Sequence, residues 1–242
     1  MPPLDRAFDS PDQKRRHVRR LFATIADRYD LITRVLSYGR DRHWKRRLVA
    51  LAGVADGEAA LDLATGTGDL AFLVAARGAR VVGLDVTHRM IQLARAKAPA
   101  GPRPAWVVGD MTALPCPDAA VSLVTTGYGL RNVPDLTHAI REVARVLIPG
   151  GRFLSLDFNR PSHPVVRAVY LAYLTLVGAA LGWVLHGDPD TYRYIPASIR
   201  RYPGAEGVAD QLRDHGFDEV HVVPVLGGLM TIHVARRSAE GH

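Results

Sequence analysis

The spacing of hydrophobic positions changes along the chain, from helical periodicity to short apolar runs. Over residues 18–36, apolar residues recur three or four positions apart, which predicts an amphipathic helix. A second helix is expected over residues 41–51, with Asp41 as N-cap and Gly53 near its end. Residues before about 13 are rich in Pro and Asp, and we expect them to be frayed. These helices precede the first strand and should form a lid or flank.

From residue 60 onward, short apolar runs alternate with helical patterns. Strands are expected over residues 60–64, 80–84, 104–108, 121–125, 152–157, 220–223 and 230–235. Helices are expected from Asp69 and over residues 87–97, 136–147 and 208–215. This alternation predicts an α/β fold with a doubly wound, mostly parallel seven-stranded sheet and right-handed crossovers.

Residues 162–203 do not follow this alternation and predict a helical insertion after the fifth strand. Within them, residues 168–185 carry no charge over about the length of a membrane-spanning helix. Two glycines interrupt the run, whereas its tyrosines and tryptophan suit a membrane–water interface. Three alternatives remain open: a buried helix over the active site, an interfacial helix or apolar-substrate gate, and a membrane span.

The length of 242 residues and a hydrophobic content of 48% predict one globular domain with a well-buried core. We expect four parts within it. They are a helical lid (residues 1–52), a cofactor-binding core (53–160), a substrate-side insertion (161–203), and a C-terminal helix with a strand pair (204–242).

Charge and cysteine content indicate which partners and which cellular compartment to expect. The net charge is +7, and much of the excess lies in residues 14–20 and 40–47. Such runs suit nucleic acid or an anionic membrane surface, but also the solvated faces of two helices. Cys116 is the only cysteine, and residues 1–20 contain no apolar signal segment. We therefore expect a cytoplasmic protein, with peripheral attachment to a membrane left open.

The segment ALDLATGTGDLA, residues 60–71, indicates a ligand site. Gly66 and Gly68 form a turn between a buried strand and a helix that starts at Asp69, so backbone N–H groups can approach a nucleotide-like cofactor. Asp85, at the end of the second strand, is placed to accept hydrogen bonds from ribose hydroxyls. A dinucleotide site, or a tight turn without a ligand, would give the same pattern.

Two later features favour S-adenosylmethionine over a nicotinamide cofactor. Asp110 and Met111 follow the third strand, where a carboxylate suits the exocyclic amine of adenine. The two C-terminal strands are adjacent in sequence, which is more typical of a methyltransferase than of a dehydrogenase. Asp85 and Asp110 could also be ordinary residues of strand-end turns.

The chain resembles the UbiE/MenG family of quinone-biosynthesis C-methyltransferases over residues 22–233. The segments that carry the resemblance are FATIADRYDLITRVLSYGRDRHWKR (22–46), LDLATGTGDLA (61–71), GYGLRNVPD (127–135), RVLIPGGRFLSLDFNRP (145–161) and HGDPDTYRYIPASIRRYP (186–203). This resemblance implies a Rossmann-like class I methyltransferase. It also implies methyl transfer from S-adenosylmethionine to a ring carbon of a prenylated demethylquinol, a precursor of menaquinol or ubiquinol.

The resemblance also implies positions for the site. Cofactor contacts would fall on Thr67, Asp85, Asp110, Met111 and Gly127, the last at a position often occupied by Ser. Thr65 stands where Cys or Gly is usual, Asp157 and Asn159 replace Glu and Ser, and residues 165–185 are unusually apolar. The apolar character of residues 165–185 leaves the head group and tail length of the substrate open. It does not affect the expected cofactor.

For catalysis, the ring carbon becomes nucleophilic when the adjacent phenol loses its proton. Arg131 and Asn132, just past the fourth strand, are the candidates for orienting and polarising that oxygen. Arg131 stays protonated and cannot be the base, although it could instead form a surface ion pair. Asp157, a third catalytic candidate, His163 and a relayed water remain alternatives for the base.

Several alternatives remain open for the partners and for the class of activity. An aromatic–basic stretch either closes over the head group or packs a loop: Tyr192, Arg193, Tyr194, Arg200 and Arg201. We expect a prenylated quinol substrate and no nucleic acid, because no aromatic platform for single strands is evident. An RNA methyltransferase and a non-catalytic methyltransferase-like protein are the competing classes, and a homodimer is left open. The ten histidines lack metal-ligand spacing, so no metal site is expected.

Overall fold

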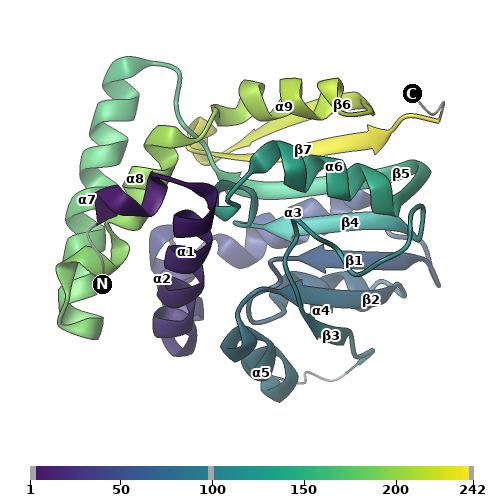
Figure 1. Ribbon diagram of the computed structural model, residues 1–242, viewed down its shortest axis with the longest axis horizontal. Helices are drawn as coiled ribbons and strands as arrows, with labels where there is room; N and C mark the ends of the chain where they lie inside the picture. The colour runs from purple at the N-terminus through teal and green to yellow at the C-terminus, as the bar shows by residue number, and fades with distance from the viewer. Residues whose placement is uncertain (1–3, 98–100, 240–242) are drawn as a thin grey trace.

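A seven-stranded sheet forms the centre of the computed structural model, which describes residues 4–97 and 101–239 (Figure 1). Its strands are β1 (Ala59–Leu63), β2 (Arg80–Asp85), β3 (Ala105–Val108), β4 (Val121–Gly127), β5 (Leu147–Phe158), β6 (Phe217–Val225) and β7 (Met230–Arg237). They lie in the order β3-β2-β1-β4-β5-β7-β6, and only β7 runs antiparallel to its neighbours. The predicted doubly wound, mostly parallel sheet is confirmed.

Helices cover both faces of the sheet because successive side chains of a strand point to opposite faces. On β1, Ala60 packs into the cluster shared with α3 (Asp41–Ala52) and α4 (Asp69–Ala75). Its neighbour Leu61 packs into the cluster shared with α6 (Leu136–Val146) and α9 (Gly204–Asp214). The helix α5 (His88–Lys97) contacts β2 and β3. Burial on both faces explains why the strands are almost continuously apolar in sequence.

The parallel strands end at one edge, and a buried carboxylate holds two of these ends together. Asp62 on β1 accepts hydrogen bonds from Thr65 in the turn after β1, at 2.5 Å, and from Thr125 on β4, at 2.8 Å. Burial raises the pKa of Asp62 to about 6, although both hydroxyl donors oppose this shift. The glycine turn is therefore fixed to the sheet on its inner side.

The N-terminal helices are less regular than predicted. The single helix expected over residues 18–36 is wrong: α1 (Pro11–Ile25) and α2 (Tyr29–Leu36) are separated by a 3₁₀ turn over Ala26–Arg28. This bend directs Tyr29 into the pockets at the sheet edge and Asp30 toward Thr67 and Lys97. Contacts formed far along the chain therefore decide where the helix breaks.

Two expectations at helix starts are also wrong. Residues 4–12 are not frayed, because Leu4–Phe8 forms a 3₁₀ turn and Ser10 caps α1 through the backbone N–H of Gln13 at 3.3 Å. The ring of Phe8 stacks on Tyr194, 5.6 Å away, and this contact ties down the segment. Asp41 is not an N-cap but the first residue of α3, because its carboxylate contacts Lys45 and Tyr128 instead.

The insertion consists of α7 (Pro164–His186), a 3₁₀ turn (Pro189–Tyr192) and α8 (Tyr194–Arg201). In Figure 1, α7 lies at the outer edge of the molecule, away from the sheet. Its glycines do not break it: a Cβ at Gly182 would lie 2.5 Å from the carbonyl oxygen of Asp188, where the chain returns against the helix. By length and composition α7 could cross a membrane, and only 28% of its most apolar window is buried. The alternative of a buried helix over the active site is therefore wrong.

The burial of Asp62 predicts that the stability of the fold depends on pH. Its pKa is raised from 3.8 to about 6 in the folded protein, so folding favours the protonated carboxyl. The stability from this group is fully present below pH 3.8 and is lost as pH rises through 6. Relative to Asp62→Asn, the wild type should lose up to about 3 kcal/mol of unfolding free energy between pH 4 and 7. Urea unfolding at several pH values measures this difference, and parallel pH curves for the two proteins would contradict it.

Candidate active site

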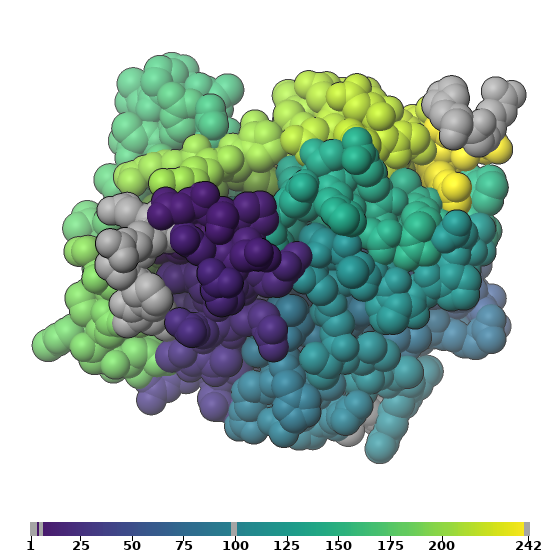
Figure 2. Space-filling view, viewed as in Figure 1, coloured from purple at the N-terminus to yellow at the C-terminus, as the bar shows by residue number. Residues whose placement is uncertain are grey.

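A pocket of about 660 Å³, including its open mouth, lies at the carboxyl edge of the sheet beneath α1. It is lined by the ends of β1 to β4, as expected for a ligand site of a doubly wound sheet. The structure brings five predicted cofactor residues together in its wall: Gly66, Asp85, Asp110, Met111 and Gly127. Figure 2 shows the N-terminal segment, which includes α1, packed between the insertion and the loops of the core.

Asp85 braces the glycine turn from the side of the pocket. Its carboxylate accepts the backbone N–H of Gly66 at 2.9 Å and that of Thr87 at 2.8 Å. Burial raises the pKa of Asp85, whereas these backbone donors lower it. Each carboxylate oxygen has a second acceptor site, so Asp85 can hold the turn and accept a ligand hydroxyl simultaneously.

Asp110 follows the neighbouring strand β3 and connects the pocket to α1. One of its oxygens accepts the backbone N–H and the hydroxyl of Thr112, at 2.9 and 2.7 Å. The other oxygen forms an ion pair with Nε of Arg15, 3.0 Å away. Sequence reasoning missed Arg15 in this role, because the basic run of residues 14–20 suited a solvated helix equally well. This ion pair therefore holds α1 over the pocket.

The other two predicted cofactor residues do not line this pocket. The Thr67 hydroxyl contacts Asp30 at 2.6 Å and Lys97 at 3.0 Å. Gly68 has a φ of +84°, and a Cβ there would lie 2.4 Å from the ring of Trp106. In the structure, Thr67 and Gly68 shape the turn, and a direct cofactor contact for either stays a prediction.

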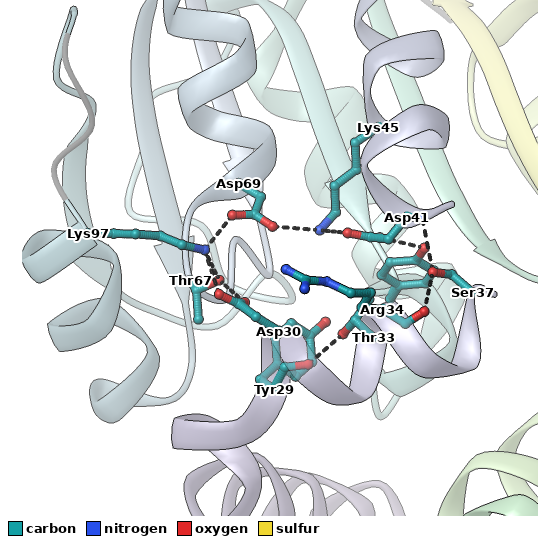
Figure 3. Close-up of polar contacts among 11 residues, drawn as sticks. Tyr29, Asp30, Thr33, Arg34, Ser37, Asp41, Lys45, Thr67, Asp69 and Lys97 are labelled. Carbon is teal, nitrogen blue, oxygen red and sulfur yellow. Dashed lines mark hydrogen bonds and ion pairs between the residues drawn. The ribbon is translucent and has the colours of Figure 1, made fainter. Parts of the chain in front are cut away.

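A network of ion pairs ties the N-terminal helices to this turn (Figure 3). Asp69, at the start of α4, lies 3.1 Å from Lys45 of α3 and 2.5 Å from Lys97 of α5. Lys45 also contacts Asp41 at 2.7 Å, and Lys97 contacts Asp30 of α2 at 2.7 Å. Burial disfavours the charge on Lys45, but its two carboxylate partners outweigh this and raise its pKa. The network therefore holds α2 and α3 against the glycine turn.

A second pocket of about 500 Å³ is mostly apolar and lies between α1, α2 and the insertion. Its apolar lining includes Leu21, Ile25, Ile32, Leu36, Tyr192, Tyr194 and Ile195. It shares four lining residues with the first pocket: Phe22, Tyr29, Tyr128 and Asn132. A ligand in either pocket would therefore contact the same wall. Tyr192 and Tyr194 of the predicted aromatic–basic stretch belong to this lining.

Arg131 and Asp157 form a buried ion pair beside the apolar pocket. Nε of Arg131 lies 3.3 Å from the Asp157 carboxylate, which also accepts the backbone N–H of Arg131 at 3.1 Å and that of Phe158 at 2.8 Å. Nη1 of Arg131 donates to Ser198 on α8. Burial raises the pKa of Asp157, whereas Arg131 lowers it. Arg131 lines the apolar pocket but Asp157 lines neither, and the alternative of a surface pair for Arg131 is wrong.

Asn132 stands at the junction of the two pockets with one polar atom unused. Its Nδ2 donates to the carbonyl of Tyr128 at 2.7 Å, which directs Oδ1 away from that carbonyl. Oδ1 is buried and has no hydrogen-bond partner among the residues that the structure describes. An unpaired buried acceptor is costly, so its presence in a pocket wall indicates a ligand donor. His163 lies at the start of α7, outside both pockets.

Sequence reasoning missed the two tyrosines of the shared wall. Tyr29 lies within FATIADRYDLITRVLSYGRDRHWKR and Tyr128 within GYGLRNVPD, two of the segments that carried the resemblance. Tyr128 adopts a left-handed backbone with φ of +62°, and its hydroxyl donates to Asp41 at 2.8 Å. Burial raises the pKa of Tyr128 well above its usual value, and neighbouring carboxylates add to this effect. Their position within these two segments was the signal in the sequence that could have identified both tyrosines as site residues.

Comparison with known proteins agrees with this architecture. The model of the ubiE/COQ5 methyltransferase family matches residues 9–237. A ubiquinone/menaquinone biosynthesis C-methyltransferase of Rubrivivax gelatinosus is 38% identical over 98% of this chain and 95% of the relative. A demethylmenaquinone methyltransferase of Thermus thermophilus is 41% identical over 90% of this chain and 100% of the relative.

Solved structures share the fold at low sequence identity. A SAM-dependent methyltransferase of Thermotoga maritima superimposes with a TM-score of 0.66 at 16% identity, over 93% of this chain and 100% of that one. One from Aquifex aeolicus has a TM-score of 0.58 at 16% identity, over 80% and 89%. The resemblance noted in the sequence is confirmed, and the chain belongs to the ubiE/COQ5 methyltransferase family.

Proposed function

We propose that this methyltransferase transfers a methyl group from S-adenosylmethionine to a ring carbon of a prenylated demethylquinol. The observation that carries the proposal is the junction of two pockets at Asn132, one at the strand ends and one apolar. A methyl donor in the first pocket and an aromatic acceptor in the second would meet there. The names of the relatives support a quinone-pathway substrate.

The residues of the first pocket fit S-adenosylmethionine. Asp85 and Asp110, at the ends of the neighbouring strands β2 and β3, supply acceptors for ribose hydroxyls and the adenine amine, while the turn at Gly66 leaves room for the rest of the molecule. Met111 is buried beside Asp110 and offers an apolar contact to the adenine ring. When bound, the cofactor supplies an electrophilic methyl group on a sulfonium.

The residues of the second pocket fit an aromatic ring that carries an isoprenoid tail. Its wall consists of aliphatic and aromatic side chains, with Arg131 and Asn132 supplying polar groups near the junction. Nε and Nη1 of Arg131 are occupied, whereas Nη2 has no hydrogen-bond partner among the described residues. Nη2 can therefore stabilise a phenolate, and Oδ1 of Asn132 can accept the hydrogen bond of a quinol hydroxyl.

Asp157 acts in this proposal as a positioning residue rather than as the general base. Its carboxylate is committed to Arg131 and to two backbone N–H groups, and it does not reach either pocket. It fixes the guanidinium plane and keeps Arg131 charged in a buried position. Of the three candidates for the base, a relayed water is the one that fits this arrangement, because Asp157 is committed to Arg131 and His163 lines neither pocket.

Methyl transfer from labelled S-adenosylmethionine to chemically reduced demethylmenaquinone, with a demethylated benzoquinol in parallel, tests the proposal. Product with either ring supports the activity and identifies the head group. The oxidised quinones are the controls, because they lack the phenol and should remain unmethylated. Cofactor binding without product on both rings would contradict the substrate class, and RNA would then be the next substrate to test.

Replacing Asp85 should impair cofactor binding. In Asp85→Ala, the cofactor loses a hydrogen-bond acceptor and the N–H groups of Gly66 and Thr87 lose theirs. Affinity for S-adenosylmethionine, measured by calorimetry, should fall at least roughly tenfold. Circular dichroism should confirm that the variant is folded, and Asp210→Ala on the exposed face of α9 serves as the matched control. Unchanged affinity would exclude Asp85 as a cofactor ligand.

Replacing Asn132 should impair turnover. Asn132→Ala removes the unpaired acceptor at the junction, and kcat should fall on the order of 100-fold. Affinity for S-adenosylmethionine should change little, because the cofactor pocket keeps both carboxylates. Single-turnover methyl transfer together with calorimetry separates the two effects. A parallel loss of cofactor affinity would mean that Asn132 serves the cofactor rather than the quinol.

The pH dependence of turnover distinguishes positioning by Asp157 from base catalysis. Asp157→Asn keeps a similar shape but removes the charge that pairs with Arg131. If Asp157 positions Arg131, kcat should fall while the ascending limb of the pH–rate profile remains. Loss of that limb would identify Asp157 as the base. Asp157→Asn and Arg131→Ala each leave the other partner's charge buried and unpaired, which should cost about 3–5 kcal/mol of stability, so circular dichroism must first show that the variant is folded.

A further inference from the structure

One face of α7 is exposed along its whole length and is entirely apolar. Its members recur three or four positions apart: Val165, Val169, Ala172, Leu176, Ala180 and Trp183. Leu176 and Trp183 are 72% and 67% exposed, which is unusual for side chains of this size. The opposite face is buried against the 3₁₀ turn at Pro189–Tyr192 and against α8. The helix is therefore two-sided, and one side lacks a partner within the described residues.

The outer side of α2 continues this surface. Leu31 and Val35 of α2 and Tyr38 in the turn after it are exposed, and the ring of Tyr38 stacks on Tyr173 of α7 at 5.6 Å. The inner side of α2 lines the apolar pocket with Ile32 and Leu36. One short helix thus separates the proposed substrate pocket from the outside. We call the six α7 residues together with Leu31, Val35 and Tyr38 the apolar face.

Arginines lie at both ends of the apolar face. Arg160, Arg167 and Arg200 line an open hollow at the N-terminal end of α7, and none of them forms an ion pair with a described residue. Arg28 lies near His186 at the other end, where its charge lowers the pKa of that histidine after the larger effect of burial. Asp188 and Asp190 also lie at this end; Asp188 opposes the effect of Arg28 on His186, and Asp190 is paired with Arg193. Positive charge is therefore concentrated at the N-terminal end of the apolar face, and Arg28 adds a single arginine near the other end.

We propose that the apolar face docks onto an anionic lipid bilayer, with α7 lying in the plane of the interface. Apolar side chains would enter the boundary between headgroups and acyl chains, while the arginines contact anionic headgroups. A membrane span does not fit, because it would expose to lipid the side of α7 that packs on the insertion. The proposal rests on the proposed function, since an isoprenoid-tailed substrate lies in the bilayer and α2 separates that bilayer from the pocket.

Co-sedimentation of the full chain with vesicles tests the docking. The protein should bind vesicles that contain phosphatidylglycerol much more tightly than pure phosphatidylcholine vesicles. Leu176→Glu should weaken binding roughly tenfold or more, because a buried leucine contact is replaced by a charge. Arg167→Gln and Arg200→Gln should each weaken binding to anionic vesicles roughly fivefold. The matched controls are Ile148→Glu and Arg103→Gln, both at exposed sites outside α7 and α2, and should bind like the wild type.

Trp183 offers a direct depth probe, because Trp44 is buried and Trp106 is half-buried. Brominated acyl chains should quench the fluorescence of the wild type, and Trp183→Phe should abolish most of that quenching. Light scattering without lipid tests a second copy of this chain as the occupant. A dimer that Leu176→Glu converts to monomer, without quenching by brominated lipid, would overturn the proposal. Equal vesicle binding by the wild type and Leu176→Glu would also overturn it.

A short-tailed demethylquinol in solution separates this proposal from the proposed function. Leu176→Glu should methylate that substrate at the wild-type rate, because Leu176 lines neither pocket. With the long-tailed substrate in vesicles, the same variant should lose activity in proportion to its lost binding. Vesicle binding without methylation of any quinol would leave the docking intact and defeat the proposed function. Methylation without vesicle binding would support the proposed function and overturn the docking.

Discussion

The ion-pair network around Asp69 is the contact on which the rest of the site depends. It connects the start of α4 to Lys45 and Lys97, and through them to Asp41 and Asp30 on the N-terminal helices (Figure 3). The sheet alone would supply only an open edge. Both pockets require α1 and α2 to lie over that edge, because Phe22 and Tyr29 form part of the wall that they share. Closure of the site thus depends on these partly buried charges together with the apolar packing of α1 and α2 into the core.

Three buried carboxylates serve different purposes at this edge. Asp62 fastens the turn after β1 to β4, Asp85 braces the same turn from the pocket side, and Asp157 holds Arg131 in place. Burial raises the pKa of all three, and each is supplied with hydrogen-bond donors that counter this effect. Of the three, only Asp85 lines either of the two pockets that meet at Asn132. A carboxylate near a strand end is therefore not by itself a ligand-binding residue.

The insertion combines two requirements in one segment. Its inner residues, Tyr192 and Tyr194, complete the apolar pocket, and Ser198 contacts Arg131. Its long helix α7 packs by one side only and contributes nothing to either pocket lining. A segment needed merely to close the pocket would not require a helix of 23 residues with an apolar outer face. Substrate handling and surface contact thus meet in the part of the chain that departs most from the general fold.

The sequence by itself determined the mostly parallel sheet and the clustering of Gly66, Asp85 and Asp110, because strand periodicity and right-handed crossovers are local or topological rules. The sequence could not predict the break between α1 and α2, the ion pair of Asp41 with Lys45, or the burial of Arg131 against Asp157. These depend on side chains that are distant in sequence. The exposure of α7 was likewise undecided, since an apolar helix gives the same pattern in a core and at a surface. Only the tertiary structure selected among these alternatives, because burial and charge pairing are set by which elements pack together.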